Sequence, residues 1–267
     1  MECEYTVPGW RGKMIPKIIH YCWLSDEPVP EKFQKFMNTW KELLPDYEFI
    51  KWDFSKFDKD SSDWVSEAFA YKKYACASDY IRLYAIYYYG GIYLDMDIEM
   101  IKPFGELLNK TYMFAYENPS CAGIEAGCFG AEKGDSFLKA CLERYKGRHY
   151  VLEDGSFDRT ILPVVMKKCL EDEKFNYKVY NHNYFTAKSF ETGRIKITDE
   201  TYCVHHFAGT WKTKEEKEFI HEMNRLSRIF GVKIGRNLAE YRYEISKNGF
   251  HGAVSLTKDK INRKRNK

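Results

Sequence analysis

The sequence of 267 residues has no long apolar run of the kind that a membrane-spanning helix needs. No stretch approaches about 18 consecutive apolar residues, the length required to cross a bilayer as a helix. Residues 1–14 are polar and mixed in charge, so they lack the apolar centre of a secretory signal peptide. We therefore expect a soluble protein that stays in the cytoplasm, where it is made.

Several motifs that mark common classes of protein are also missing. The eight cysteines are scattered without any C-x-x-C pair, so we expect free thiols, several of them buried, and no zinc site. The chain contains no Walker loop, no G-x-G-x-x-G, no G-x-S-x-G and no internal repeat.

Net charge is small, because 42 Lys and Arg stand against 39 Asp and Glu, and an excess of +3 does not indicate nucleic-acid binding. Residues 258–267 nevertheless hold six basic residues and one acid. Such tails are usually disordered and solvated. Attraction to anionic lipid is the alternative, so we also consider peripheral contact between this tail and the inner face of the membrane.

The chain is organised around one strongly patterned stretch, residues 75–101. Its first half has apolar residues three and four apart, the spacing of a helix with one buried face. Asp79 and Arg82 are three apart and should emerge on one side of that helix. Gly90 and Gly91 should end it, as glycine does just beyond a helix C-terminus.

Two aspartates follow a short strand at the end of this stretch. Residues 92–94 suit a buried strand, and Asp95 and Asp97 come directly after it. Alternate residues of a strand point the same way, so both carboxylates should face one side and Met96 the other. Open α/β sheets bind ligands at the carboxyl ends of strands, and two carboxylates suit Mg2+ or Mn2+ beside a diphosphate.

A second D-x-D, Asp58-Lys59-Asp60, shows that the motif alone is a weak signal. With fifteen aspartates in the chain, about one D-x-D is expected by chance. Asp58 and Asp60 follow no strand and lie in a charged, Ser-rich stretch that we interpret as a solvated loop. The corresponding alternative for Asp95 and Asp97 is a strand end capped by solvated acids, but their context favours a metal site.

Two histidines follow a further predicted strand near the end of the chain. Residues 202–204 are predicted to form a strand, and His205 and His206 follow it directly. Neutral imidazole is an acceptable Mn2+ ligand, and strand alternation lets only one of the two histidines face the metal. We favour His205 and keep His206 as the alternative.

The remaining pattern predicts an α/β fold. Alternating apolar residues favour a first strand at 17–23 and a second at 47–52, with a helix at 30–44 between them. Residues 118–130 are rich in small residues and could line a ligand pocket, where Glu125 is either a carboxylate that accepts hydrogen bonds from ligand hydroxyl groups or an exposed loop acid. Further helices are expected at 64–74, 136–145, 155–170 (interrupted by Pro163) and 215–230, and a strand at 112–116.

The segment SDYIRLYAIYYYGGIYLDMDIE, residues 78–99, is similar to the core motif of the D-x-D glycosyltransferases. These include bacterial capsular-polysaccharide sugar transferases and yeast initiating mannosyltransferases, and the glucosylating domains of large clostridial toxins share the motif. IPKIIHYCWL, residues 15–24, resembles the first strand of the same family, and H-H-x-x-G-T-W, residues 205–211, resembles its last motif. The resemblance spans about residues 14–212.

This resemblance implies a GT-A type, Rossmann-like nucleotide-sugar-binding sheet flanked by helices. We expect that domain at 1–213, and a C-terminal helical extension with the basic tail at 214–267. A metal ion, Mn2+ or Mg2+, would be held by Asp95, Asp97 and one of the two histidines.

The resemblance also implies roles for residues that bind the donor. Trp23 would stack on the nucleotide base, although a tryptophan packed in the core is the ordinary alternative. Tyr93 would contact the nucleoside. Asp79 and Arg82 would bind the hydroxyl groups of the donor sugar, with a plain intrahelical ion pair as the alternative.

Trp211 and Lys212 would reach the diphosphate in the same family, Lys212 as a point charge. The implied function is metal-dependent transfer of a hexose, with retention, from a nucleotide-diphosphate sugar. We expect a UDP-sugar as donor and a glycan or lipid-linked saccharide as acceptor, in synthesis of surface or capsular polysaccharide. The rivals are a non-catalytic nucleotide-sugar or glycan-binding module, and a metal-dependent phosphoesterase, which would need more clustered acids and histidines than the sequence offers.

Overall fold

The computed structural model describes residues 14–173, 175–209 and 212–265. The chain divides into two compact units. Unit 1 comprises Met1–Ala187 and Lys196–His206, and unit 2 comprises Lys188–Ile195 and Phe207–Lys267. The division expected from sequence, at residue 213, stays a prediction, because compactness alone does not establish an independently folding domain.

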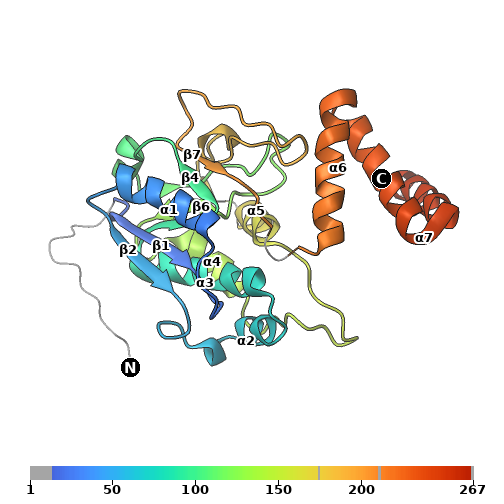
Figure 1. Ribbon diagram of the computed structural model, residues 1–267. Helices are drawn as coiled ribbons and strands as arrows, with labels where there is room; N and C mark the ends of the chain where they lie inside the picture. Colours follow the sequence, from blue (N-terminus) through green and yellow to red (C-terminus); the bar gives the residue numbers. More distant parts are fainter. Residues whose placement is uncertain (1–13, 174, 210–211, 266–267) are drawn as a thin grey trace. The chain divides into compact units, whose positions relative to one another are not determined.

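Unit 1 is built on a five-stranded sheet with the order β2-β1-β3-β6-β5. β1 pairs in parallel with both β2 and β3, whereas β6 runs antiparallel to β3 and β5 (Figure 1). The parallel strands bring their carboxyl ends to one edge, which is the edge where open sheets bind ligands. The strands are β1 (Ile18–Cys22), β2 (Glu48–Trp52), β3 (Gly91–Leu94), β5 (Tyr112–Met113) and β6 (Cys128–Ala131).

Helices cover both faces of this sheet, which confirms the expected α/β class (Figure 1). Alternation along β3 divides the core. Ile92 and Leu94 pack on one side with Trp40, and Tyr93 packs on the other side with Ile81. The helix on the first side is α1 (Glu31–Leu43), and those on the second are α2 (Asp63–Ala70), α3 (Tyr74–Tyr89), α4 (Ser136–Glu143) and α5 (Leu162–Asp172).

The central helix α3 ends where the glycines predicted it would. Gly90 has φ +70°, a conformation that glycine adopts without steric cost, and its amide donates to the carbonyl of Ile86. Gly91 then enters β3 so close to β1 that a Cβ atom there would lie 2.6 Å from the carbonyl oxygen of Ile18. Both glycines are therefore needed to join α3 to the strand that precedes the two aspartates.

A small second sheet in unit 1 joins residues far apart in sequence. β4 (Ile98–Met100) pairs antiparallel with β7 (Cys203–His205), so that Ile98 lies opposite His205. Trp40 of α1 donates from Nε1 to the Ile98 carbonyl at 2.7 Å, which fixes β4 against the helix. This pairing places the strand that follows Asp95 and Asp97 beside residues more than 100 positions later in the sequence.

Two local predictions were wrong. Residues 155–161 are not helical, and α5 begins at Leu162 with Pro163 in its first turn, where a missing N–H costs nothing. The proline thus starts the helix that it was expected to interrupt. The basic tail, which we expected to be disordered, is helical as far as Arg265, because it continues α7 (Val232–Arg265).

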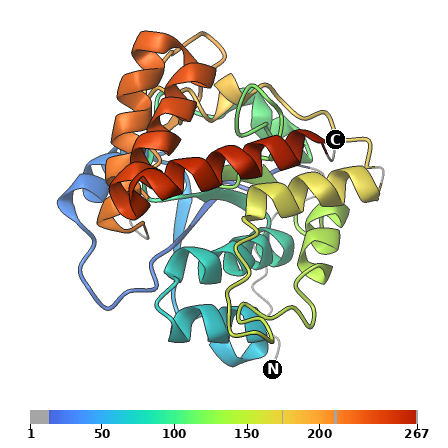
Figure 2. The same cartoon turned by 90° about the vertical axis from the view of Figure 1, so that its right-hand side faces the viewer.

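Unit 2 is helical. α6 (Lys214–Phe230) starts with a capping box in which Thr213 and Glu216 satisfy each other's backbone N–H groups. α7 is kinked at Gly249, where φ is +62° and ψ is −162°, and its second stretch turns back from the first (Figure 2). Met223 and Leu226 of α6 pack on Ala239 of α7. Among the described residues, no helix combines the length and apolar character of a membrane span.

Candidate active site

Asp95 and Asp97 lie on the turn that joins β3 to β4. The Asp95 amide donates a hydrogen bond of 2.7 Å to the carbonyl of Gly127. The Ile98 amide donates a hydrogen bond of 2.9 Å to the Asp95 carbonyl, which closes the turn. Met96 is buried, with 7% of its surface exposed. The two carboxylates therefore converge through a tight turn, not through the strand alternation that the sequence predicted.

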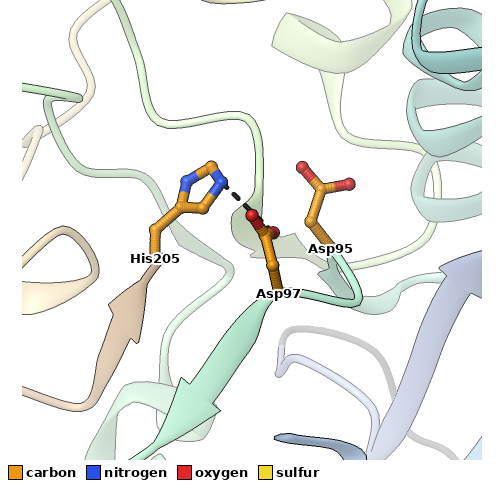
Figure 3. A group of neighbouring side chains, drawn as sticks. All are labelled: Asp95, Asp97 and His205. Atoms are coloured by element: carbon orange, nitrogen blue, oxygen red, sulfur yellow. Dashed lines mark ion pairs between the residues drawn. The ribbon is translucent and has the colours of Figure 1, made fainter. Parts of the chain in front are cut away.

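His205 reaches the two aspartates from β7. Its Nε2 lies 3.4 Å from Asp97 Oδ1, and one ligand atom from each of Asp95, Asp97 and His205 lies within 4.8 Å of the others (Figure 3). The side chains are 26%, 12% and 13% exposed, respectively, so the group is accessible from solvent on one side. Chain segments about 110 residues apart thus form one cluster.

This cluster fits a divalent cation. Two carboxylate oxygens and one imidazole nitrogen are ligands that Mn2+ accepts, and partial exposure leaves room for water or phosphate oxygens. The electrostatics agree. Burial alone would lower the pKa of His205, but the charges of Glu125 and Asp97 raise it well above its usual value. The same negative potential that favours a proton on this imidazole favours a metal ion in its place.

Glu125 orients His205. Its Oε1 accepts from His205 Nδ1 at 3.0 Å and from the Gly127 amide at 2.6 Å, and its Oε2 accepts from Thr186 Oγ1 at 2.7 Å. Glu125 lies in the loop before β6 but is only 1% exposed, so the interpretation as an exposed loop acid was wrong, and the sugar-binding role stays a prediction. Burial would raise the pKa of Glu125, but His205 and these hydrogen bonds hold it below its usual value.

The Glu125 contact leaves His205 Nε2 directed at the aspartates, the arrangement by which carboxylates position metal-binding histidines. Gly127 makes this close packing feasible. A Cβ atom there would lie 2.7 Å from His205 Cε1 and 3.0 Å from Asp95 Oδ2. Sequence reasoning missed both roles, and the only available signal was the run of small residues around Glu125.

Arg82 and Tyr93 hold Asp95 from the other side. Arg82 Nη1 donates to Asp95 Oδ2 at 3.1 Å and Tyr93 Oη donates to Asp95 Oδ1 at 2.9 Å. The guanidinium lies 4.6 Å from the centre of the Tyr93 ring, and both residues are at most 5% exposed. Burial raises the pKa of Asp95 and Arg82 opposes that shift, so Arg82 fixes the carboxylate and favours its charged form.

Asp79 lies next to Arg82 on α3, as their spacing predicted. Its Oδ1 is 3.4 Å from Arg82 Nη2, and its side chain is 16% exposed. Burial raises the pKa of Asp79 to about 6, although Arg82 opposes the shift. Arg82 is buried and also donates to Ser78 and to the Ala126 carbonyl. Asp79 is therefore the more accessible of the pair.

Trp23 lies at the same edge of the sheet as the aspartates, because it follows β1 and β1 is the parallel neighbour of β3. Its Nε1 donates to the Glu27 carbonyl at 2.7 Å. It lines a pocket of about 510 Å3 together with residues from the carboxyl end of β2, among them Lys51, Asp53 and Phe54. A tryptophan in such a pocket is suited to stacking on a planar ligand.

His206, the alternative metal ligand, pairs with a different carboxylate. His206 Nε2 is 2.7 Å from Glu99 Oε2, and its ring stacks on Phe36 with centroids 4.4 Å apart. Lys212 belongs to unit 2, where its amide donates to the Gly209 carbonyl. Trp211 lies outside the described residues.

Comparison with known proteins agrees with this site. Residues 30–114, which include both aspartates, match the family model of the glycosyltransferase sugar-binding region containing a DXD motif. The chain is 34% identical over 128 residues to inositol phosphoceramide mannosyltransferase 3 of Schizosaccharomyces pombe. It is 34% identical over 158 residues to inositol phosphoceramide mannosyltransferase 1 of the same yeast.

These matches cover 46% and 55% of this chain but only 35% and 48% of the two relatives. A solved structure, the PaToxG glycosyltransferase, aligns with a TM-score of 0.47 and 22% identity over 61% of this chain and 72% of its own. Residues 30–114 are thus similar to the DXD-containing sugar-binding region of glycosyltransferases, and the chain spans less than half the length of the two mannosyltransferases that it resembles.

Proposed function

We propose that this chain transfers a hexose from a nucleotide-diphosphate sugar to a hydroxyl group of a glycan or a lipid-linked acceptor. The observation that supports this most directly is the convergence of Asp95, Asp97 and His205 at the strand edge that also carries Trp23. The names of the relatives favour mannose as the hexose and an inositol phosphoceramide as the acceptor. A UDP-sugar donor and a capsular polysaccharide acceptor are the alternatives within the same reaction class.

The leaving group of this reaction is a nucleoside diphosphate, and its departure develops negative charge on the diphosphate oxygens. Mn2+ or Mg2+ bound by Asp95, Asp97 and His205 would supply Lewis-acid stabilisation of that charge. Arg82 favours the ionised form of Asp95 and Glu125 fixes the ring of His205, so the ligand groups need little rearrangement.

Other side chains would bind the donor. Trp23 would stack on the base, and the accessible carboxylate of Asp79 would accept hydrogen bonds from sugar hydroxyl groups. Trp211 and Lys212 stay candidates for contact with the diphosphate. We propose retention of the anomeric configuration by same-face displacement, and we propose that the reaction takes place at the cytoplasmic side of a membrane.

Screening a panel of donors tests the proposal. GDP-mannose, UDP-glucose, UDP-galactose and UDP-N-acetylglucosamine are each incubated with the protein and Mn2+, and release of the nucleoside diphosphate is measured. We expect one donor to be hydrolysed well above the others, in a metal-dependent way. Binding of UDP or GDP by calorimetry without turnover of any donor would instead favour the non-catalytic binding module.

A further inference from the structure

The two units differ in charge. Unit 2 contains 17 Lys and Arg but only 8 Asp and Glu, for a net charge of +9. Since the whole chain carries +3, unit 1 carries −6. Residues 258–267 contribute +5 of this charge and the rest of unit 2 contributes +4, so the basic character extends beyond the C-terminal residues.

The first stretch of α7 displays apolar side chains. Ile234, Leu238, Tyr241 and Ile245 are spaced by four, three and four residues, so they form one stripe along the helix. Ile234 is 56% exposed, Leu238 39% and Ile245 46%. A stripe of this length on a helix surface is unusual in a segment that is otherwise rich in charge.

The second stretch repeats the pattern. Phe250, Val254, Thr257 and Ile261 have the same spacing of four, three and four. Phe250 is 77% exposed, the highest value among the large apolar side chains of the described residues, and Val254 and Ile261 are 40% and 47% exposed.

The two stripes lie side by side. Tyr241 and Thr257, one from each stripe, share a hydrogen bond of 3.0 Å between their hydroxyl groups. Lys260 Nζ donates to Asn237 Oδ1 at 2.6 Å, so the second stretch runs antiparallel to the first across Gly249. Together they form one surface, the α7 apolar face, which consists of Ile234, Leu238, Tyr241, Ile245, Phe250, Val254 and Ile261.

Basic residues border this face. Lys258 is exposed and lies four residues after Val254 and three before Ile261, which places it beside the stripe. Arg242, also exposed, has the corresponding place on the first stretch, four residues after Leu238 and three before Ile245. An exposed apolar stripe bordered by basic residues is the pattern of helices that lie in the interface of an anionic bilayer.

We propose that the α7 apolar face docks on the surface of an anionic lipid bilayer. The apolar side chains would enter the region between headgroups and acyl chains, and the bordering basic residues would contact the anionic headgroups. Charge favours lipid over a second copy of this chain, because a symmetric contact would bring two units of +9 together. The proposal does not depend on the transfer reaction.

Vesicle sedimentation tests the proposal with the full chain. The test variant carries Leu238→Gln, Ile245→Gln and Phe250→Gln, at side chains 39%, 46% and 77% exposed. The matched control carries Leu152→Gln, Ile161→Gln and Ile197→Gln in unit 1, where exposure is 43%, 46% and 56%. Vesicles of phosphatidylcholine alone are compared with vesicles that contain about one third phosphatidylglycerol.

We expect wild type and control to sediment with the anionic vesicles, less so at high salt, and the test variant to bind roughly tenfold more weakly or worse. Equal binding by test variant and wild type would overturn the proposal, since the basic residues alone would then account for it. Absence of wild-type binding would also overturn the proposal, as would a concentration-dependent dimer that only the test variant disrupts. Circular dichroism melts show whether both variants fold, and donor hydrolysis in solution, which needs no vesicle, separates this test from that of the reaction.

Discussion

The chain contains the D-x-D pattern twice, in very different surroundings. Asp58 is exposed, and its carboxylate accepts a hydrogen bond from the Asp60 amide at 3.0 Å, while Asp60 pairs with the adjacent Lys59. All of these contacts are local and satisfy a turn. Asp95 and Asp97, in contrast, contact residues brought from α3 and β7.

This difference explains what the second pair can do. A carboxylate in water gains little from binding one more cation, because solvent already stabilises its charge. Asp97 is 9% exposed and faces His205, so its charge is poorly solvated and a metal ion compensates for that cost. The capacity for metal binding thus comes from burial and distant partners, which the three-letter motif does not contain.

The strongest way to break the comparison is to mutate both motifs in the same manner. Asp97→Asn keeps the size of the side chain and removes the charge, so we expect transfer or donor hydrolysis to fall roughly a thousandfold or more. Asp60→Asn should leave the rate unchanged. Steady-state rates of the two variants, with circular dichroism to verify folding, decide the matter. A nearly active Asp97→Asn variant would remove this carboxylate from the mechanism.

Metal removal provides a second test of the same contrast. We expect EDTA to reduce donor turnover more than about a hundredfold and added Mn2+ to restore it, because the developing charge on the diphosphate loses its counter-ion. Isothermal titration should also find one Mn2+ per chain, since the exposed Asp58 motif offers only two solvated acids. Turnover that resists the chelator, or a second ion lost on Asp60→Asn, would contradict the distinction.

Sequence reasoning found the parts of the site that depend on local pattern. The helix, the glycine pair and the strand before Asp95 follow from periodicity and backbone freedom, and the structure has all three in the expected places. Strand alternation indicated that only one of His205 and His206 could face the aspartates, and His205 is the histidine that lies beside Asp97. The helix, glycine pair and strand required only neighbouring residues, whereas the metal-binding role of His205 stays a prediction.

Features that depend on distant contacts could not be predicted. Glu125 lies 80 residues from His205, and its role arises only when β6 pairs antiparallel with β3 and carries the preceding loop to the site. The convergence of the aspartates through a turn likewise depends on the hydrogen bond between the Asp95 amide and Gly127, which no local pattern reveals.

Each of the two histidines pairs with a carboxylate, and mutating these carboxylates should have a smaller effect than removing Asp97. Glu125→Gln keeps an acceptor near His205 Nδ1 but removes its charge, so we expect Mn2+ affinity to weaken roughly 10- to 100-fold. Glu99→Gln is the matched control, because Glu99 pairs with His206 in the same way, and it should leave affinity unchanged. Calorimetric titration of Mn2+ into each variant measures the effect, and the reverse ranking would identify His206 as the ligand.

The smallest effect is expected in the exposed motif itself. Asp58 accepts a hydrogen bond from the Asp60 amide at the start of a short turn, so Asp58→Ala should cost at most about 1 kcal/mol of unfolding free energy. Urea unfolding measures that cost, and donor turnover below the transition should equal that of wild type. A loss of Mn2+ affinity in this variant would mean that the solvated acids act on the metal after all. Unchanged Mn2+ affinity with slightly lower stability would mean that the two motifs share only the D-x-D pattern. Asp58 would then stabilise the backbone of a turn, whereas Asp95 and Asp97 would bind a cation.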